Sequence, residues 1–137
     1  MLTGREAAIS RSAILADRDG HRHGVAASFG YAFEGLASAW RTQPNFRIHL
    51  LLAAVLVAGG VVVRVAPVGW AVLALAIGLV VAAELFNTAL EAVVDLASPH
   101  EHPLAKLAKD ISAAGVLVAS AAAAVAGIAV LYSGLVR

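Results

Sequence analysis

Four polar side chains recur along "ELFNTALEAVVD", residues 84–95, and their types and spacing suit the binding of a metal ion. Glu84, Asn87, Glu91 and Asp95 are separated by three, four and four residues, so on a helix they share one narrow stripe. Two close carboxylates repel each other unless a cation or a proton lies between them. Oxygen ligands of this kind suit Mg²⁺, which usually takes one or two protein carboxylates together with phosphate oxygens. The stripe is therefore a candidate magnesium site.

The same stretch ends a long apolar run, "APVGWAVLALAIGLVVAA", in which ionisable groups are costly. Of the 137 residues, 61% are apolar and 14% are charged, which is the composition of a membrane protein. Ionisable residues inside membrane segments usually mark function, because burying them in hydrocarbon costs free energy. We therefore expect Glu84 and Glu91 to be functional. Asp95 lies nearer the end of the run, and for this residue a functional role is weighed evenly against a carboxylate that is simply solvated or paired with Lys106, Lys109 or Arg47.

Three apolar segments and one amphipathic segment are expected to position this stripe. The apolar segments, each suited to crossing a bilayer as a helix, are residues 48–66, 68–96 and 111–132. Residues 24–42 repeat large apolar side chains at a helical period, which predicts an amphipathic helix lying in the membrane interface. Residues 1–23 mix charges of both signs and predict a flexible cytoplasmic tail, which leaves 24–137 as one membrane domain. The predicted fold class is an all-α integral membrane protein.

The distribution of Lys and Arg predicts the orientation in the membrane. Six of these residues precede the first apolar segment, and Lys106 and Lys109 lie in the predicted 97–110 loop. Only Arg64 and Arg137 fall on the other side. Since positive residues are retained on the cytoplasmic side, the N-terminus and the 97–110 loop are expected in the cytoplasm. We expect a multi-pass protein of the inner (plasma) membrane, with the acidic stripe near its cytoplasmic surface.

"ELFNTALEAVVD", followed by "AKD" at residues 108–110, resembles the signature of the small prokaryotic membrane lipid kinases, the diacylglycerol kinase and undecaprenol kinase family. The similarity runs from about Ser28 to Tyr132 and includes "NFRIHL" and "SPHEHPLAKLAKD". It implies a homotrimer of three-span subunits, each with a surface helix, that transfers the γ-phosphoryl group of MgATP to the hydroxyl of a membrane lipid alcohol. The implied partners are ATP, the lipid alcohol and the bilayer, with Mg²⁺ as cofactor. We expect no nucleic-acid partner.

The resemblance also implies roles for individual residues. Glu84 corresponds to a general base, Asn87 to a residue that orients groups at the reaction centre, and Glu91 to a metal ligand at the nucleotide site. The further residues that correspond to nucleotide contacts are Tyr31, His100, Glu101, His102, Lys109 and Asp110. Where this family commonly has a second metal-binding glutamate, the chain has Gln43. An amide oxygen can bind Mg²⁺ or one of its waters but brings no charge, so Gln43 would be the weaker ligand.

Several alternatives stay open at this point. "NFRIH" and the 98–110 segment are more similar to the undecaprenol kinase branch, but both lipids present a hydroxyl on an apolar body. His100 and His102 resemble half of a zinc site, although no third ligand cluster accompanies them. Neither G-x-x-x-x-G-K-[ST] nor G-x-G-x-x-G occurs, so a nucleotide site would be built without a phosphate-binding loop. The acidic stripe would also suit a small oligomeric membrane transporter or proton-relay protein, but no internal repeat accompanies it.

Overall fold

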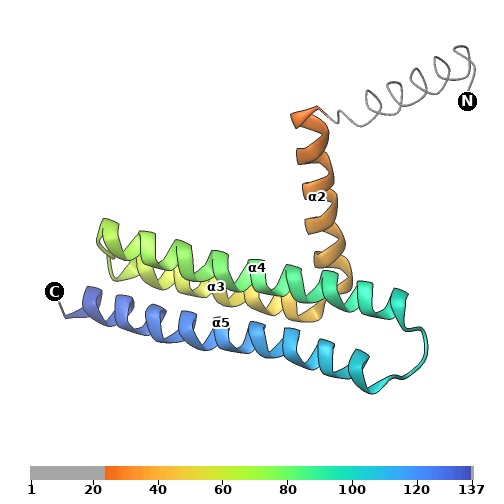
Figure 1. Cartoon of the computed structure of the whole chain (residues 1–137). Coiled ribbons are helices and arrows are strands. Elements are labelled where there is room, and N and C mark those ends of the chain that lie inside the picture. Colours follow the sequence, from red (N-terminus) through yellow and green to blue (C-terminus); the bar gives the residue numbers. More distant parts are fainter. Residues whose placement is uncertain (1–23, 137) are drawn as a thin grey trace, which may run out of the picture. The chain divides into compact units, whose positions relative to one another are not determined.

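The computed structural model describes residues 24–136, and within that range it contains helices and no strand. The helices are α2 (Val25–Thr42), α3 (Pro44–Val62), α4 (Pro67–Ala97) and α5 (Pro103–Leu135), shown in Figure 1. The tail predicted at residues 1–23 lies outside the described residues. The chain divides into two units, Met1–Ser38 and Ala39–Arg137, and each is described by itself.

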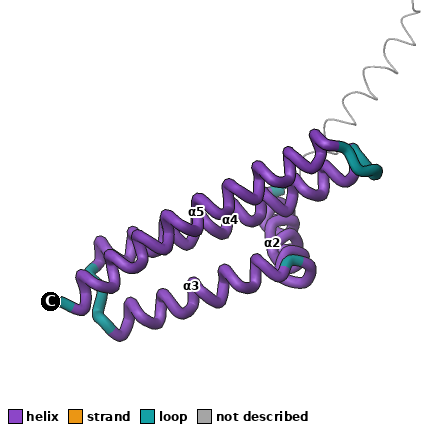
Figure 2. The backbone as a smooth tube through the Cα atoms, turned by 90° about the horizontal axis from the view of Figure 1, so that it is seen from below, coloured by secondary structure: helices purple, strands orange, loops and turns teal. Residues whose placement is uncertain are grey.

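The second unit is a bundle of three long helices. α3, α4 and α5 run antiparallel to their neighbours in the chain, and α4 packs most extensively against α5 (Figure 2). Each begins with a proline, at a position where the missing N–H breaks no helical hydrogen bond. All three are long and apolar enough to cross a membrane. The predicted all-α membrane fold is confirmed.

Large apolar side chains of this unit mostly face outward. Leu73 is the largest side chain that is fully buried, whereas Leu51, Leu75, Phe86 and Leu117 are among many that are more than half exposed. Helices that are apolar all round are covered by lipid or by other helices. The exposed apolar surface is therefore the surface expected of a chain embedded in a bilayer.

The connection between α3 and α4 begins earlier than predicted. The first span was expected to reach residue 66, but α3 ends at Val62. Arg64 adopts a left-handed conformation with φ of 55°, and the N–H of Val65 donates to the carbonyl of Gly60 at 3.0 Å. This is a Schellman motif, which satisfies the last carbonyl groups of a helix. Pro67 then begins α4.

The polar connection between α4 and α5 is shorter than predicted. A loop was expected over 97–110, but only residues 98–102 are non-helical. The difference arises because α5 begins at Pro103, within a polar segment whose composition is typical of a loop. Pro103 occupies the first turn, and Nδ1 of His102 accepts a hydrogen bond from the N–H of Leu104 at 3.2 Å, which caps the helix. The "AKD" triplet therefore lies on a helix and not in a loop.

The helix predicted over residues 24–42 is present as α2. Its large apolar residues, including Phe29, Phe33 and Trp40, are exposed. Their spacing of four and seven residues gives the helix an apolar face, which is the pattern of a helix that lies on a membrane surface.

Candidate active site

Helix α4 carries the acidic stripe from the buried part of the second unit to an exposed end. Glu84 and Asn87 are 3% and 8% exposed, Glu91 is half-buried, and the side chain of Asp95 is 65% exposed. With a rise of 1.5 Å per residue, Glu84 and Glu91 lie about 10 Å apart along the helix, with Asn87 between them. The stripe therefore leads from a buried position to an exposed one.

The buried carboxylate of Glu84 faces helix α3. Its Oε2 lies 3.9 Å from Nε2 of His49, whose side chain is 18% exposed. The sequence position of His49, at the mouth of the first span, suggests only an interfacial anchor or a headgroup contact. The structure instead places its ring beside the most deeply buried acid of the site. The two groups attract each other electrostatically when the imidazole is protonated.

Asn87 makes two side-chain hydrogen bonds, one within α4 and one to α5. Its Nδ2 donates to Oε1 of Glu91 at 3.0 Å, one helical turn further along α4. Its Oδ1 accepts a hydrogen bond from the hydroxyl of Ser112 on α5. Oγ of Ser112 also lies 3.2 Å from the carbonyl oxygen of Lys109. The candidate reaction-centre amide and the candidate metal ligand therefore belong to one hydrogen-bonded network.

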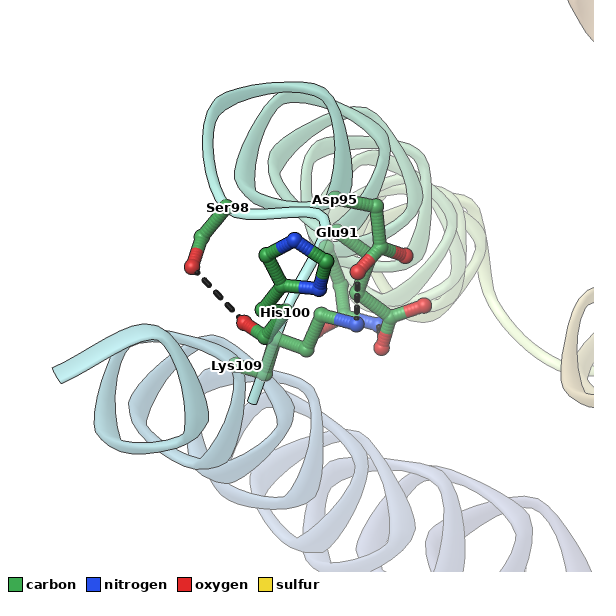
Figure 3. Close-up of polar contacts among 6 residues, drawn as sticks. Glu91, Asp95, Ser98, His100 and Lys109 are labelled. Atoms are coloured by element: carbon green, nitrogen blue, oxygen red, sulfur yellow. Dashed lines mark hydrogen bonds and ion pairs between the residues drawn. The ribbon is translucent and has the colours of Figure 1, made fainter. Parts of the chain in front are cut away.

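A polar pocket opens at the exposed end of α4. It has a volume of about 840 Å³, and its lining includes Asp95, His100, Glu101, His102 and Lys109. Lys109 reaches across from α5 to form an ion pair with Asp95, close to Glu91 and the ring of His100 (Figure 3). The hydroxyl of Ser98 donates to the carbonyl of His100 at 3.0 Å and holds the connecting loop. Lys106, Lys109 and the imidazole rings offer hydrogen-bond donors for an anionic ligand, and the carboxylates of Asp95 and Glu101 bring negative charge to the same lining.

The remaining predicted residues occupy separate positions. Asp110 forms an ion pair with Lys106 one turn back on α5, and both side chains are exposed. Gln43 is the N-cap residue of α3, where its side chain makes no capping hydrogen bond. Tyr31 is exposed on α2, in the first unit. Among residues 24–136, no three His, Asp or Glu side chains gather closely enough to hold a metal ion by themselves.

These features define a class of protein: a helical membrane protein whose second span carries a partly buried acidic site next to a cation-lined polar pocket. Comparison with known proteins gives the family. The family model described as prokaryotic diacylglycerol kinase matches residues 30–131. The chain therefore belongs to this family of membrane lipid kinases, as the resemblance predicted. Membership of a kinase family argues against the alternative of a transporter or proton relay.

Individual relatives carry two different names. The chain is 45% identical to a diacylglycerol kinase of Synechocystis over 101 residues, which are 73% of this chain and 58% of that protein. It is 36% identical to the undecaprenol kinase of Bacillus subtilis over 108 residues, covering 79% and 88% of the two chains. It is 35% identical to the diacylglycerol kinase of Escherichia coli over 107 residues, covering 76% and 85%. The relatives thus include kinases named for each of the two lipids.

Two contacts of the site were missed by reasoning from the sequence. His49 and Ser112 lie 35 and 25 residues from their partners Glu84 and Asn87, so no local pattern connects them. A signal existed only for Ser112. It follows Lys109 by three residues, so on a helix it shares a face with that lysine.

Proposed function

We propose that this protein transfers the γ-phosphoryl group of ATP to the hydroxyl of a membrane lipid alcohol. The observation that carries the proposal is the arrangement along α4. A buried carboxylate, Glu84, lies about 10 Å along the helix from Glu91. Glu91 lies one turn before Asp95, which lines the polar pocket together with Lys109. A lipid hydroxyl arrives from the bilayer and ATP arrives from water, so a site that joins the two environments suits both substrates.

In the proposed reaction, Glu84 accepts the proton of the lipid hydroxyl. The hydroxyl oxygen forms a bond with the γ-phosphorus, the bond from that phosphorus to the bridging oxygen breaks, and ADP leaves with the electron pair. Phosphoryl transfer requires chiefly alignment of the reacting groups and compensation of phosphate charge. Asn87 lies between Glu84 and Glu91, where its amide can align groups near the γ-phosphate. Lys109 offsets phosphate charge from the side of the pocket.

The donor set fits Mg²⁺ carried in with the nucleotide. Mg²⁺ usually keeps several waters and takes one or two protein oxygens in addition to phosphate oxygens, and when bound it neutralises the charge that develops on the phosphates. Glu91 supplies a half-buried carboxylate, one oxygen of which accepts the hydrogen bond from Asn87. The side-chain amide of Gln43 makes no capping hydrogen bond, and it would be the second ligand, without a charge. This set is too small for a metal held by the protein alone.

The nucleotide is proposed to bind in the polar pocket at the end of α4. Lys109 and His100 would contact phosphates, and Glu101 and His102 line the same pocket. Because Nδ1 of His102 caps α5, only Nε2 of that ring is left for a nucleotide. Tyr31 and Asp110 are further proposed contacts, supported only by the family resemblance.

The membrane arrangement is proposed from the sequence. The N-terminus and the connection at residues 98–102 would lie in the cytoplasm, where ATP is available, and α2 would lie on the surface of the inner membrane. Three copies would assemble into the homotrimer that the resemblance implies. All three spans have exposed apolar residues, which lipid and neighbouring subunits would cover.

The experiment that tests the proposal is a phosphoryl-transfer assay. Purified protein in detergent micelles is incubated with ATP labelled in the γ-phosphate, Mg²⁺, and either undecaprenol or a diacylglycerol. We expect label in at least one lipid and none when EDTA removes Mg²⁺. The ratio of the two rates identifies the substrate. Absence of label in both lipids, with protein that is folded by circular dichroism, would refute the proposal.

A further inference from the structure

We propose that Ser112 is a positioning residue of this site, whose hydroxyl fixes the Asn87 amide so that its NH₂ group points at Glu91. The inference rests on the proposed kinase function for its catalytic consequence. The hydrogen bond on which it depends is a feature of the structure itself.

The chemistry of the three groups allows one favourable arrangement. A carboxylate such as Glu91 only accepts hydrogen bonds, so the Asn87 atom that faces it has to be the nitrogen. The amide oxygen then points to α5, where the hydroxyl of Ser112 donates to it. If the amide turned over, its oxygen would face the carboxylate and the two would repel each other. Ser112 therefore supports the orientation that Glu91 requires.

Burial makes this support necessary. Asn87 is 8% exposed, so its amide oxygen has little access to water. A buried acceptor without a donor raises the free energy of the folded state, because no hydrogen bond replaces the one it made with water. Without the Ser112 hydroxyl, the amide would rotate toward another donor, and Glu91 would lose the hydrogen bond that orients its carboxylate. The effect should be largest on the step that depends on Glu91, the use of Mg²⁺.

The chain provides a matched control residue. Ser120 lies about two turns further along the same helix, and its buried hydroxyl has no hydrogen-bond partner in the part of the chain that the structure describes. Replacing Ser120 by Ala removes the same atom from the same helix without touching the network. Replacing Ser112 by Thr keeps a hydroxyl and provides a rescue variant.

The first measurement detects the hydrogen bond without any assay of activity. The chain contains two asparagines, Asn45 and Asn87, so ¹⁵N-asparagine labelling yields two side-chain NH₂ signals in micelles. We expect Ser112→Ala to shift the Asn87 signal and leave that of Asn45 in place. Ser120→Ala should move neither signal. An Asn87 signal that Ser112→Ala does not move would overturn the proposal.

The second measurement separates positioning from folding. We expect Ser112→Ala to raise the Mg²⁺ concentration for half-maximal rate about threefold to tenfold, the range for one lost hydrogen bond, with the lipid KM unchanged. Ser112→Thr should restore the requirement, and Ser120→Ala should match the wild type. A wild-type magnesium requirement in Ser112→Ala would overturn the proposal. A wild-type protein that phosphorylates neither lipid would instead refute the kinase function, and the NMR experiment would still report on the bond.

Discussion

The replacement of Glu84 by Gln tests the proposed general base most directly. Gln has nearly the same shape as Glu but cannot accept the hydroxyl proton. A positioned general base contributes about 10²- to 10⁴-fold to a rate. Glu91 is about 10 Å away along α4 and cannot substitute as the base. His49, with Nε2 at 3.9 Å from Oε2 of Glu84, could take the proton instead and would limit the loss. We therefore expect kcat to fall about 10³-fold.

The same variant should leave the fold intact. Glu84 is 3% exposed, and an ionised carboxylate is costly to bury, so removing its charge should not lower the thermal unfolding temperature in micelles. The KM for ATP should change little, because the polar pocket lies at the far end of the stripe. Glu34→Gln, on the exposed surface of α2, removes one carboxylate elsewhere and serves as the control. A Glu84→Gln rate within about threefold of the wild type would exclude Glu84 as the base.

Three further predictions concern other parts of the chain. Replacing Gln43 by Glu should lower the Mg²⁺ concentration for half-maximal rate, since it adds a charged oxygen ligand; an unchanged requirement in a magnesium titration would place Gln43 away from the metal. Asp95→Asn should lower the KM for ATP, because Asp95 competes with the phosphates for Lys109. The effect should be only about twofold to threefold, since an exposed ion pair is weak. A raised KM would show that Asp95 itself binds the nucleotide or its metal. Gly134→Ala should lower the unfolding free energy by about 1–3 kcal/mol, since a Cβ there would lie 2.8 Å from Cγ2 of Val63 and 3.1 Å from its carbonyl oxygen; a thermal melt equal to that of the wild type would contradict this packing.

The features that depend on the residues of a single chain segment could be predicted from the sequence. The stripe on α4 follows from the spacing of Glu84, Asn87 and Glu91, because helical geometry alone places residues three and four apart on one face. The three spans follow from their length and apolar composition. The start of α5 was missed because the polar residues around Pro103 suggest a loop, whereas the cap by His102 starts a helix there.

Contacts between helices could not be predicted in this way. Whether Ser112 faces Asn87 depends on the rotation of α5 about its own axis and on its register against α4. Both are set by the packing of many small side chains along the two helices. The approach of His49 to Glu84 depends in the same way on α3. A single sequence contains no local pattern that reports these rotations, so the residues that hold the site together were found only in the structure.

Gln43 stands where this family commonly has a glutamate, and this difference makes the hydrogen bonds among Ser112, Asn87 and Glu91 more important. With an uncharged residue at that position, Glu91 is the one charged protein ligand proposed for Mg²⁺. A single carboxylate attracts the metal less strongly than two, so its orientation matters more to the occupancy of the site. Asn87 orients Glu91, and Ser112 orients Asn87. Fixing the direction of the one remaining carboxylate is therefore a physical means by which this chain can offset the missing charge.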